Sequence, residues 1–95
     1  MFDIRFGEGN EILVEGRLDA SQVDRARQFL DRVTTSHMLN FTGLQYISSA
    51  GLGVLLAAQK RLSGTGQKLG IRGMNSHIRD IFRYARFDLI FEIRD

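Results

Sequence analysis

The sequence contains no cysteine and no proline, and it has only two histidines, His37 and His77. Without cysteine the chain cannot form a disulfide, a thiolate metal site or a thiol nucleophile, and we expect no structural zinc. Low-complexity segments, internal repeats and linkers are also absent, so residues 1–95 are expected to form one domain. With 43% hydrophobic and 25% charged residues, the chain has too much apolar material to remain disordered.

Long hydrophobic stretches are missing as well. No uninterrupted apolar run approaches the roughly 20 residues that a membrane helix needs. The first nine residues include Asp3, Arg5 and Glu8, and they lack both the basic and the apolar region of a signal peptide. We therefore expect a cytoplasmic protein that does not insert into a membrane.

The formal charge of +2 is small, but basic side chains gather between residues 60 and 86. They could face an acidic partner. A solvated surface is the simpler interpretation, because no aromatic platform or nucleic-acid motif accompanies them, and we expect no nucleic-acid binding. The basic residues are Lys60, Arg61, Lys68, Arg72, Arg79, Arg83 and Arg86, with only Asp80 as a counter-charge in that stretch.

The first third of the chain has the pattern of a hairpin followed by a helix. Apolar residues alternate over residues 2–6 and again at Ile12 and Val14, on either side of a glycine-containing turn, which predicts two strands. A helical stripe then predicts a helix over residues 22–34. Ser21 is its expected N-cap, as in a capping box.

The remaining two thirds alternate between strands and helices. We predict a strand at residues 37–41, a helix from Ser49, a strand at residues 68–72, a helix capped at Asn75 and a strand at residues 89–93. Helices between successive strands imply parallel neighbours and right-handed crossovers. The expected fold class is α/β, a mixed β-sheet in the order β-β-α-β-α-β-α-β with three to four helices packed mainly on one face.

The junction before the second predicted helix is unusual. Ser48 and Ser49 are followed by Gly51 and Gly53 within the first turn, although each glycine costs about 1 kcal/mol relative to alanine inside a helix. Close approach of another backbone would explain that cost. A hydroxyl at a helix N-terminus also lies where a phosphate is well received. The alternative is that one serine is merely the N-cap.

Three segments, in the same order, resemble the STAS domains of anti-sigma factor antagonists. Residues 46–56 (YISSAGLGVLL) resemble the family signature D-S-[ST]-G-L, residues 15–19 (EGRLD) resemble its G-x-L-D element, and residues 76–82 (SHIRDIF) resemble its final helix. The resemblance covers nearly the whole chain. It implies a STAS fold, with Ser49 at the position that the family phosphorylates and Asp19 and Asn40 where acidic residues often lie beside that serine.

The resemblance also implies a function in transcription regulation and no catalytic group, cofactor or metal. The unphosphorylated protein would bind an anti-sigma factor serine kinase with a histidine-kinase-like ATPase fold. Phosphorylation of Ser49 would release that kinase, and a PP2C-type phosphatase would reset the switch. The implied partner-binding residues are Asp19, Ser21, Asn40, Ser48, Ser49, Ala50, Gly51, Leu52 and Gly53.

Two departures and two alternatives remain open. Ser48 stands where the family usually has Asp, and the loop before His37 looks several residues short. A cytoplasmic STAS accessory subunit of an ABC-type lipid or solute transporter is the alternative binding function. A serine hydrolase is disfavoured, because Ile47 occupies the first glycine position of G-x-S-x-G and neither histidine has an orienting carboxylate at a recognisable spacing.

Overall fold

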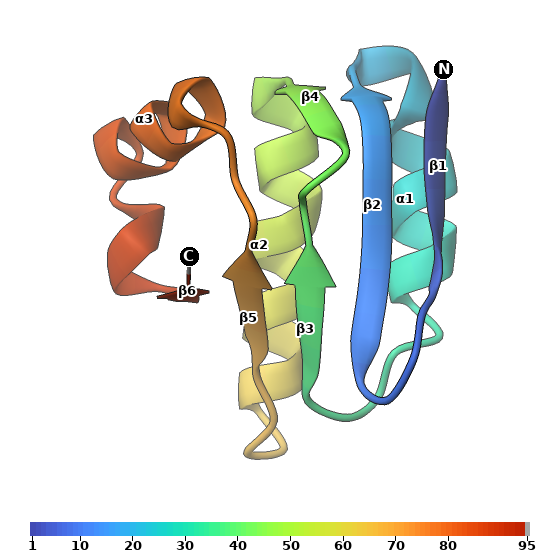
Figure 1. Ribbon diagram of the computed structural model, residues 1–95. Helices are drawn as coiled ribbons and strands as arrows, with labels where there is room; N and C mark the ends of the chain where they lie inside the picture. Colours follow the sequence, from blue (N-terminus) through green and yellow to red (C-terminus); the bar gives the residue numbers. More distant parts are fainter. Residues whose placement is uncertain (95) are drawn as a thin grey trace.

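The computed structural model describes residues 1–94 as a six-stranded mixed sheet with three α-helices, shown in Figure 1. The strands follow the order β1-β2-β3-β5-β6, and β4 pairs with the C-terminal half of β2. Only β1 is antiparallel to its neighbour. The predicted fold class is confirmed. The elements are β1 (Phe2–Phe6), β2 (Glu11–Leu18), η1 (Ala20–Gln22), α1 (Val23–Leu30), β3 (His37–Asn40), β4 (Leu44–Ile47), α2 (Ser49–Ser63), β5 (Leu69–Arg72), α3 (Ser76–Tyr84), η2 (Phe87–Leu89) and β6 (Glu92–Arg94).

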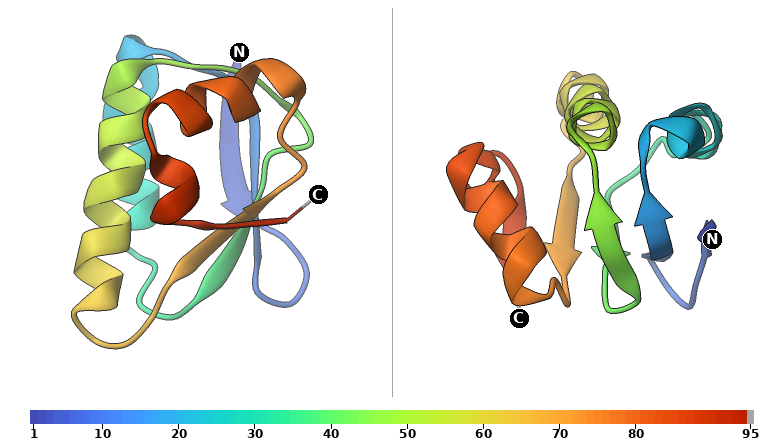
Figure 2. Two further views of the ribbon diagram at one scale, coloured as in Figure 1. Left: turned by 90° about the vertical axis from the view of Figure 1, so that its left-hand side faces the viewer. Right: turned by 90° about the horizontal axis from the view of Figure 1, so that it is seen from above.

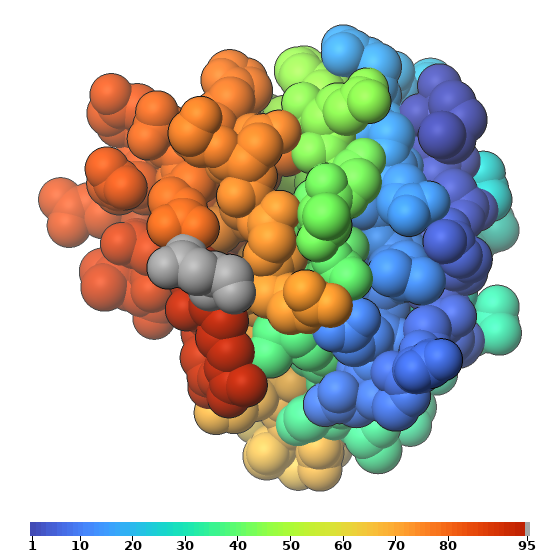
Figure 3. All heavy atoms as spheres, in the orientation of Figure 1, coloured from blue at the N-terminus to red at the C-terminus, as the bar shows by residue number. Residues whose placement is uncertain are grey.

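The helices leave one face of the sheet open. Helices α1 and α2 pack side by side on the other face, and α3 lies at the edge beyond β5 (Figure 2). Strand β2 shows why the layers form: Ile12, Val14 and Leu18 are buried, and the side chains that alternate with this face, those of Leu13, Glu15 and Arg17, point away from the helices. Figure 3 shows the open face, where side chains of β2, β3 and β5 form the surface.

Strand β4 was absent from the predicted element order. The first half of β2 pairs with β3 and its second half, from Gly16 to Leu18, pairs with β4. The chain bends between these two strands, where the Gly16 N–H donates to the Gly43 carbonyl at 2.9 Å. A four-residue strand with one polar and one half-buried position carries too little periodicity to be recognised. Because β4 runs along the end of β2, it carries the chain to the start of α2.

Helix α1 is shorter than predicted, and its cap differs. It covers Val23–Leu30, not residues 22–34, because Val33 folds back into the core through a 3.0 Å hydrogen bond to the Leu30 carbonyl. Ser21 is not an N-cap. It lies inside the 3₁₀ helix η1, which Asp19 caps by accepting the Ser21 N–H, and α1 itself has no side-chain cap.

The predicted strand over residues 89–93 is wrong in its first half. Phe87 and Phe91 both pack edge-on against Phe82, with ring centroids 5.7 and 6.1 Å away. The Phe91 N–H donates to the Phe87 carbonyl at 2.9 Å, so the chain turns helically between the two rings and both can be buried against Phe82, which an extended strand would not allow. The sheet resumes only at β6 (Glu92–Arg94).

Arg86, just after α3, provides a stability prediction. It has φ 62°, in the left-handed region, directly after the C-cap Ala85. Glycine is the residue usually found there. We expect Arg86→Gly to raise the free energy of unfolding by about 0.5 to 1 kcal/mol, because a side chain is strained at this φ. Urea unfolding measures it. Ala85→Gly is the control, since Ala85 has φ −78°, and it should lower stability.

Candidate functional site

The candidate site lies at the end of the sheet where β2 and β4 both stop. The Ser48 N–H donates to the Leu18 carbonyl at 2.9 Å, so the start of α2 is tied to the end of β2. Asp19 and η1 follow Leu18 directly and lie next to α2. The structure therefore brings together residues that are about 30 positions apart in the sequence, as the parallel arrangement of β2 and β4 requires.

The two serines at this junction have different surroundings. Ser48 has extended backbone geometry and is the N-cap of α2, with its Oγ accepting the Gly51 N–H at 3.1 Å. Ser49 is the first helical residue and is exposed. Within residues 1–94 no side-chain hydrogen bond engages the Ser49 hydroxyl. The capping role thus falls to Ser48, and Ser49 is left available at the positive end of the α2 dipole.

Asp19 provides a fixed negative charge at the same end of the sheet. Its Oδ1 accepts the Ser21 hydroxyl at 2.5 Å and the Ser21 N–H at 3.0 Å. The Ser21 hydroxyl bond, aided by the nearby Arg17 guanidinium and the terminal amine, lowers the pKa of Asp19 below its ordinary value. Asp19 is therefore ionised at neutral pH, and its orientation is set by Ser21.

The two glycines near the start of α2 have different surroundings. A Cβ on Gly51 would lie 2.9 Å from both Leu18 Cγ and Ile47 Cγ1, whereas one on Gly53 would meet no atom within 4 Å. Close packing of α2 against the chain therefore explains Gly51 but not Gly53. Ala50 and Gly53 are exposed and Leu52 is half-buried, so a smooth surface of small residues adjoins the Ser49 hydroxyl.

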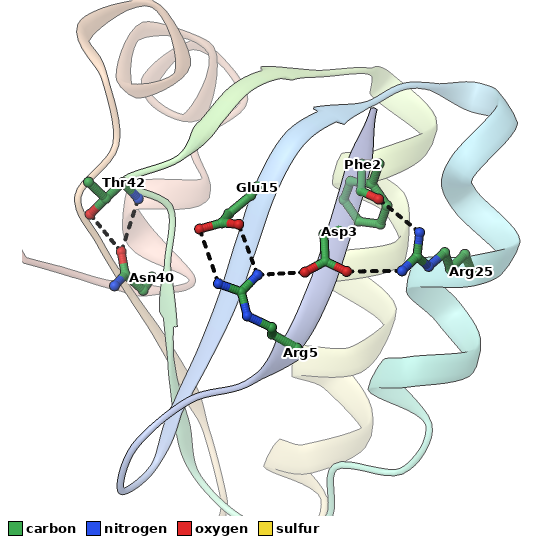
Figure 4. A network of polar contacts seen from close by, with 7 residues as sticks. All are labelled: Phe2, Asp3, Arg5, Glu15, Arg25, Asn40 and Thr42. Carbon is green, nitrogen blue, oxygen red and sulfur yellow. Dashed lines mark hydrogen bonds and ion pairs between the residues drawn. The ribbon is translucent and has the colours of Figure 1, made fainter.

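Asn40 does not join this site. It pairs with Leu13 on β2, whereas Ile47 pairs with Leu18. Five residues along a strand correspond to about 16 Å at a rise of about 3.3 Å per residue. Asn40 instead accepts the Thr42 N–H and hydroxyl at 3.0 and 2.6 Å on the open face, as Figure 4 shows.

Ion pairs cross the open face of the sheet. The Arg5 guanidinium contacts Asp3 at 2.5 Å and Glu15 at 2.8 Å, and Arg25 reaches from α1 to Asp3 and to the Phe2 carbonyl (Figure 4). These side chains are partly exposed, where ion pairs contribute little stability. Their charges are satisfied within the chain, so this face competes poorly with the start of α2 as a candidate site.

A neighbouring cluster gives a pH-dependent prediction. Asn40 Nδ2 donates to Glu11 at 3.3 Å, and the Arg72 guanidinium, bonded to the other Glu11 oxygen at 2.6 Å, is the main reason the pKa of Glu11 is lowered. In Asn40→Asp an oxygen replaces Nδ2 and faces the Glu11 carboxylate, which raises the pKa of the new pair. We expect thermal stability to fall at pH 7 and the deficit to shrink towards pH 4, because a single proton taken up by the pair relieves the repulsion.

The control for this prediction is Asn40→Asp combined with Glu11→Gln, because an amide can donate to the new carboxylate. Thermal melts of the single and double variants at pH 7 and pH 4 make the comparison. A deficit that persists unchanged at pH 4, or that the double variant retains in full at pH 7, would contradict the electrostatic explanation.

Two candidates at this end of the sheet were missed by sequence reasoning. The Arg17 guanidinium lies 4.4 Å from the centre of the Tyr46 ring, and the two residues are paired in register between β2 and β4. The alternation of β2 places Arg17 on the open face. Only the recognition of β4 would have revealed Tyr46 as its neighbour.

Within the described residues 1–94, no three His, Asp or Glu side chains gather into a metal-binding group. None of the helices in this part of the chain is both long and apolar enough to cross a membrane.

A sequence model of the family described as "Mlab, STAS domain" matches residues 6–92. This chain belongs to that STAS-domain family, so the resemblance found in the sequence is confirmed. Comparison with curated proteins gives no match.

Solved structures of anti-sigma factor antagonists share the fold. The Bacillus cell fate determinant SpoIIAA in its phosphorylated form is 17% identical and has a TM-score of 0.72, covering 100% of this chain and 92% of SpoIIAA. An anti-sigma factor antagonist from Mycobacterium paratuberculosis is 17% identical, with a TM-score of 0.82 and coverage of 98% and 83%. A STAS protein from Planctomyces limnophilus is 15% identical, with a TM-score of 0.81 and coverage of 100% and 91%.

Proposed function

We propose that this chain is an anti-sigma factor antagonist whose binding to a serine kinase is controlled by phosphorylation of Ser49. The observation that carries the proposal is the division of roles at the start of α2, where Ser48 caps the helix and Ser49 keeps an exposed hydroxyl. A kinase can reach such a hydroxyl without unfolding the helix. The kinase supplies ATP, Mg²⁺ and the catalytic base, so this chain acts as ligand and substrate and not as an enzyme.

The proposed binding surface consists of the residues around Ser49. Ala50 and Gly53 allow the partner to approach α2 closely, and Leu52 adds an apolar contact beside them. Asp19, oriented by Ser21, offers a carboxylate to a donor on the partner. Ser48 and Gly51 support the first turn of α2 from inside the fold. Asn40 lies outside the proposed binding surface.

Phosphorylation acts on the interface in this scheme. A phosphate carries about −1.5 to −2 charges and is well tolerated at a helix N-terminus. A partner that closes over the neutral Ser49 hydroxyl would have to desolvate this dianion next to the ionised Asp19. SpoIIAA in its unphosphorylated and phosphorylated forms has similar TM-scores to this chain, 0.74 and 0.72, which supports a mechanism without refolding. A PP2C-type phosphatase would restore the binding state in the cytoplasm.

A transporter accessory subunit is the second candidate. Ser48 at the position where the antagonists usually carry Asp favours it, as does the family description "Mlab, STAS domain". Affinity purification of the tagged chain from its own cells, followed by mass spectrometry, separates the two. A histidine-kinase-like ATPase that elutes when the chain is phosphorylated supports the switch. A transporter ATPase in its place would replace our proposal with the second candidate.

A further inference from the structure

A second surface lies on the other half of α2, away from Ser49. There α2, Ile90 at the end of η2, and Glu92 of β6 border an open hollow of about 480 Å³. Figure 2 shows η2 beside the middle of α2. The residues that matter for the argument are Leu56, Gln59, Lys60, Lys68, Ile90 and Glu92.

The base of the hollow is rigid. Gln59 is buried, and its side-chain amide accepts the Leu69 N–H at 2.7 Å and donates to the Leu69 carbonyl at 3.2 Å and the Ile90 carbonyl at 2.9 Å. These three bonds satisfy the amide and hold η2 at a fixed position relative to α2 and β5. The hollow is thus preformed, as binding sites usually are.

Large apolar side chains are exposed at this hollow and next to it in the chain, although the core does not require them there. Phe87 and Phe91 already anchor η2 in the core, whereas Leu89 is 76% exposed and Ile90 is 41% exposed. Leu56, half-buried on α2, packs against the core beside them. Consecutive large aliphatic residues next to a groove are typical of a protein-binding surface.

The charged residues that line the hollow are two lysines and one glutamate, so its net charge is positive. Within residues 1–94, no ion pair engages the Lys60 ammonium, and Lys68 and Arg94 share the single carboxylate of Glu92. A second copy of this chain in a symmetric dimer would place these cations opposite the same cations. A segment with carboxylates beside an apolar stripe would instead meet complementary charge.

The groove also continues the surface around Ser49. Ser49, Leu52, Leu56 and Lys60 follow one another at spacings of three or four residues, so they lie along one side of α2. Eleven residues of helix extend over about 16 Å. A helical segment of a partner bound at Ser49 could therefore reach this groove. This link to Ser49 rests on the proposed function, whereas the existence of the groove does not.

We propose that the groove of Leu56, Lys60 and Ile90, with the exposed Leu89 next to Ile90 in the chain, binds an amphipathic helix whose apolar face is flanked by carboxylates. The test uses the ¹⁵N-labelled full chain and two synthetic peptides of about 18 residues, long enough to form helices. Both have the same leucine face, and their flanks carry either glutamate or lysine. We expect the glutamate peptide to bind with a Kd below about 1 mM and to shift the amide signals of Leu56, Lys60 and Ile90.

Variants make the test specific. The double variant Leu89→Ser, Ile90→Ser should weaken binding of the glutamate peptide at least about tenfold, and Lys60→Glu should reverse the preference between the peptides. Tyr84→Ser is the control, since Tyr84 is 89% exposed on α3, and it should change nothing. Circular dichroism verifies folding, and if the double variant unfolds, Lys60→Glu keeps the test valid because Lys60 is exposed and its replacement leaves the core intact.

Three results would overturn the proposal: equal binding of both peptides, no binding at about 1 mM, or signal shifts confined to other surfaces. Self-association in sedimentation experiments that Leu89→Ser abolishes would also overturn it, because a second copy would then occupy the groove. The test uses neither the kinase nor Ser49. Its failure is therefore distinguishable from failure of the proposed switch.

Discussion

Phosphorylation of Ser49 is expected to weaken binding of the partner kinase at least about a hundredfold, which corresponds to about 2.7 kcal/mol. Ser49 is exposed at the first position of α2, beside the flat surface of Ala50 and Gly53. A partner that contacts this surface covers the hydroxyl, and it would have to bury a phosphate dianion in the modified protein. Calorimetric titration of the kinase with both forms of the chain measures the loss.

The same modification should leave the fold nearly unchanged. The free amides and the dipole at the start of α2 favour a negative charge, so the melting temperatures of the two forms should be close. Ser49→Ala should bind constitutively and resist phosphorylation. Ser49→Asp should bind weakly, although one carboxylate has less charge than a phosphate. Ser48→Ala is a useful contrast, because loss of the N-cap should cost about 1 kcal/mol of stability while the phosphoacceptor stays in place.

The second large effect is expected at Gly51. Gly51→Val should lower the free energy of unfolding by about 1 to 3 kcal/mol, because its Cβ alone would lie 2.9 Å from the buried side chains of Leu18 and Ile47. The variant should also lose partner affinity, since any shift of α2 moves Ser49. Chemical denaturation and calorimetry measure the two effects.

Gly53→Ala is the matched control, two residues further along the same helix. Its Cβ meets no atom within 4 Å, and alanine is favoured over glycine in a helix by about 1 kcal/mol. We therefore expect Gly53→Ala to stabilise the chain and to reduce partner affinity. A Gly51→Val variant as stable as the wild type would refute the packing explanation. A Gly53→Ala variant with full affinity would show that no partner approaches α2 closely there.

The sequence predicted most of the elements because their periodicities were strong. The hairpin of β1 and β2, the start of α2 at Ser49 and the Asn75 cap of α3 are found as predicted. The failures share one cause, because tertiary contacts determine the secondary structure of these short segments. Strand β4 exists because the end of β2 needs a partner, and η2 exists because two phenylalanines pack on Phe82.

The site was predictable in part. The serine pair and the glycines could be singled out because these residue types are disfavoured inside a helix. In the structure Ser48 caps α2 and Gly51 allows close packing, whereas Ser49 and Gly53 have neither role. Asp19 lies near them because β2 ends beside α2. Asn40 could not be placed correctly from sequence, because its distance from Ser49 depends on β4, which separates the end of β3 from the helix.

The most direct test of the central claim is to locate the phosphate. The purified chain is incubated with the cognate kinase and ATP, digested and examined by tandem mass spectrometry. The proposed switch predicts a single phosphate on Ser49 and none on the capping Ser48. Phosphate on Ser48 or Thr42 with Ser49 unmodified would contradict it.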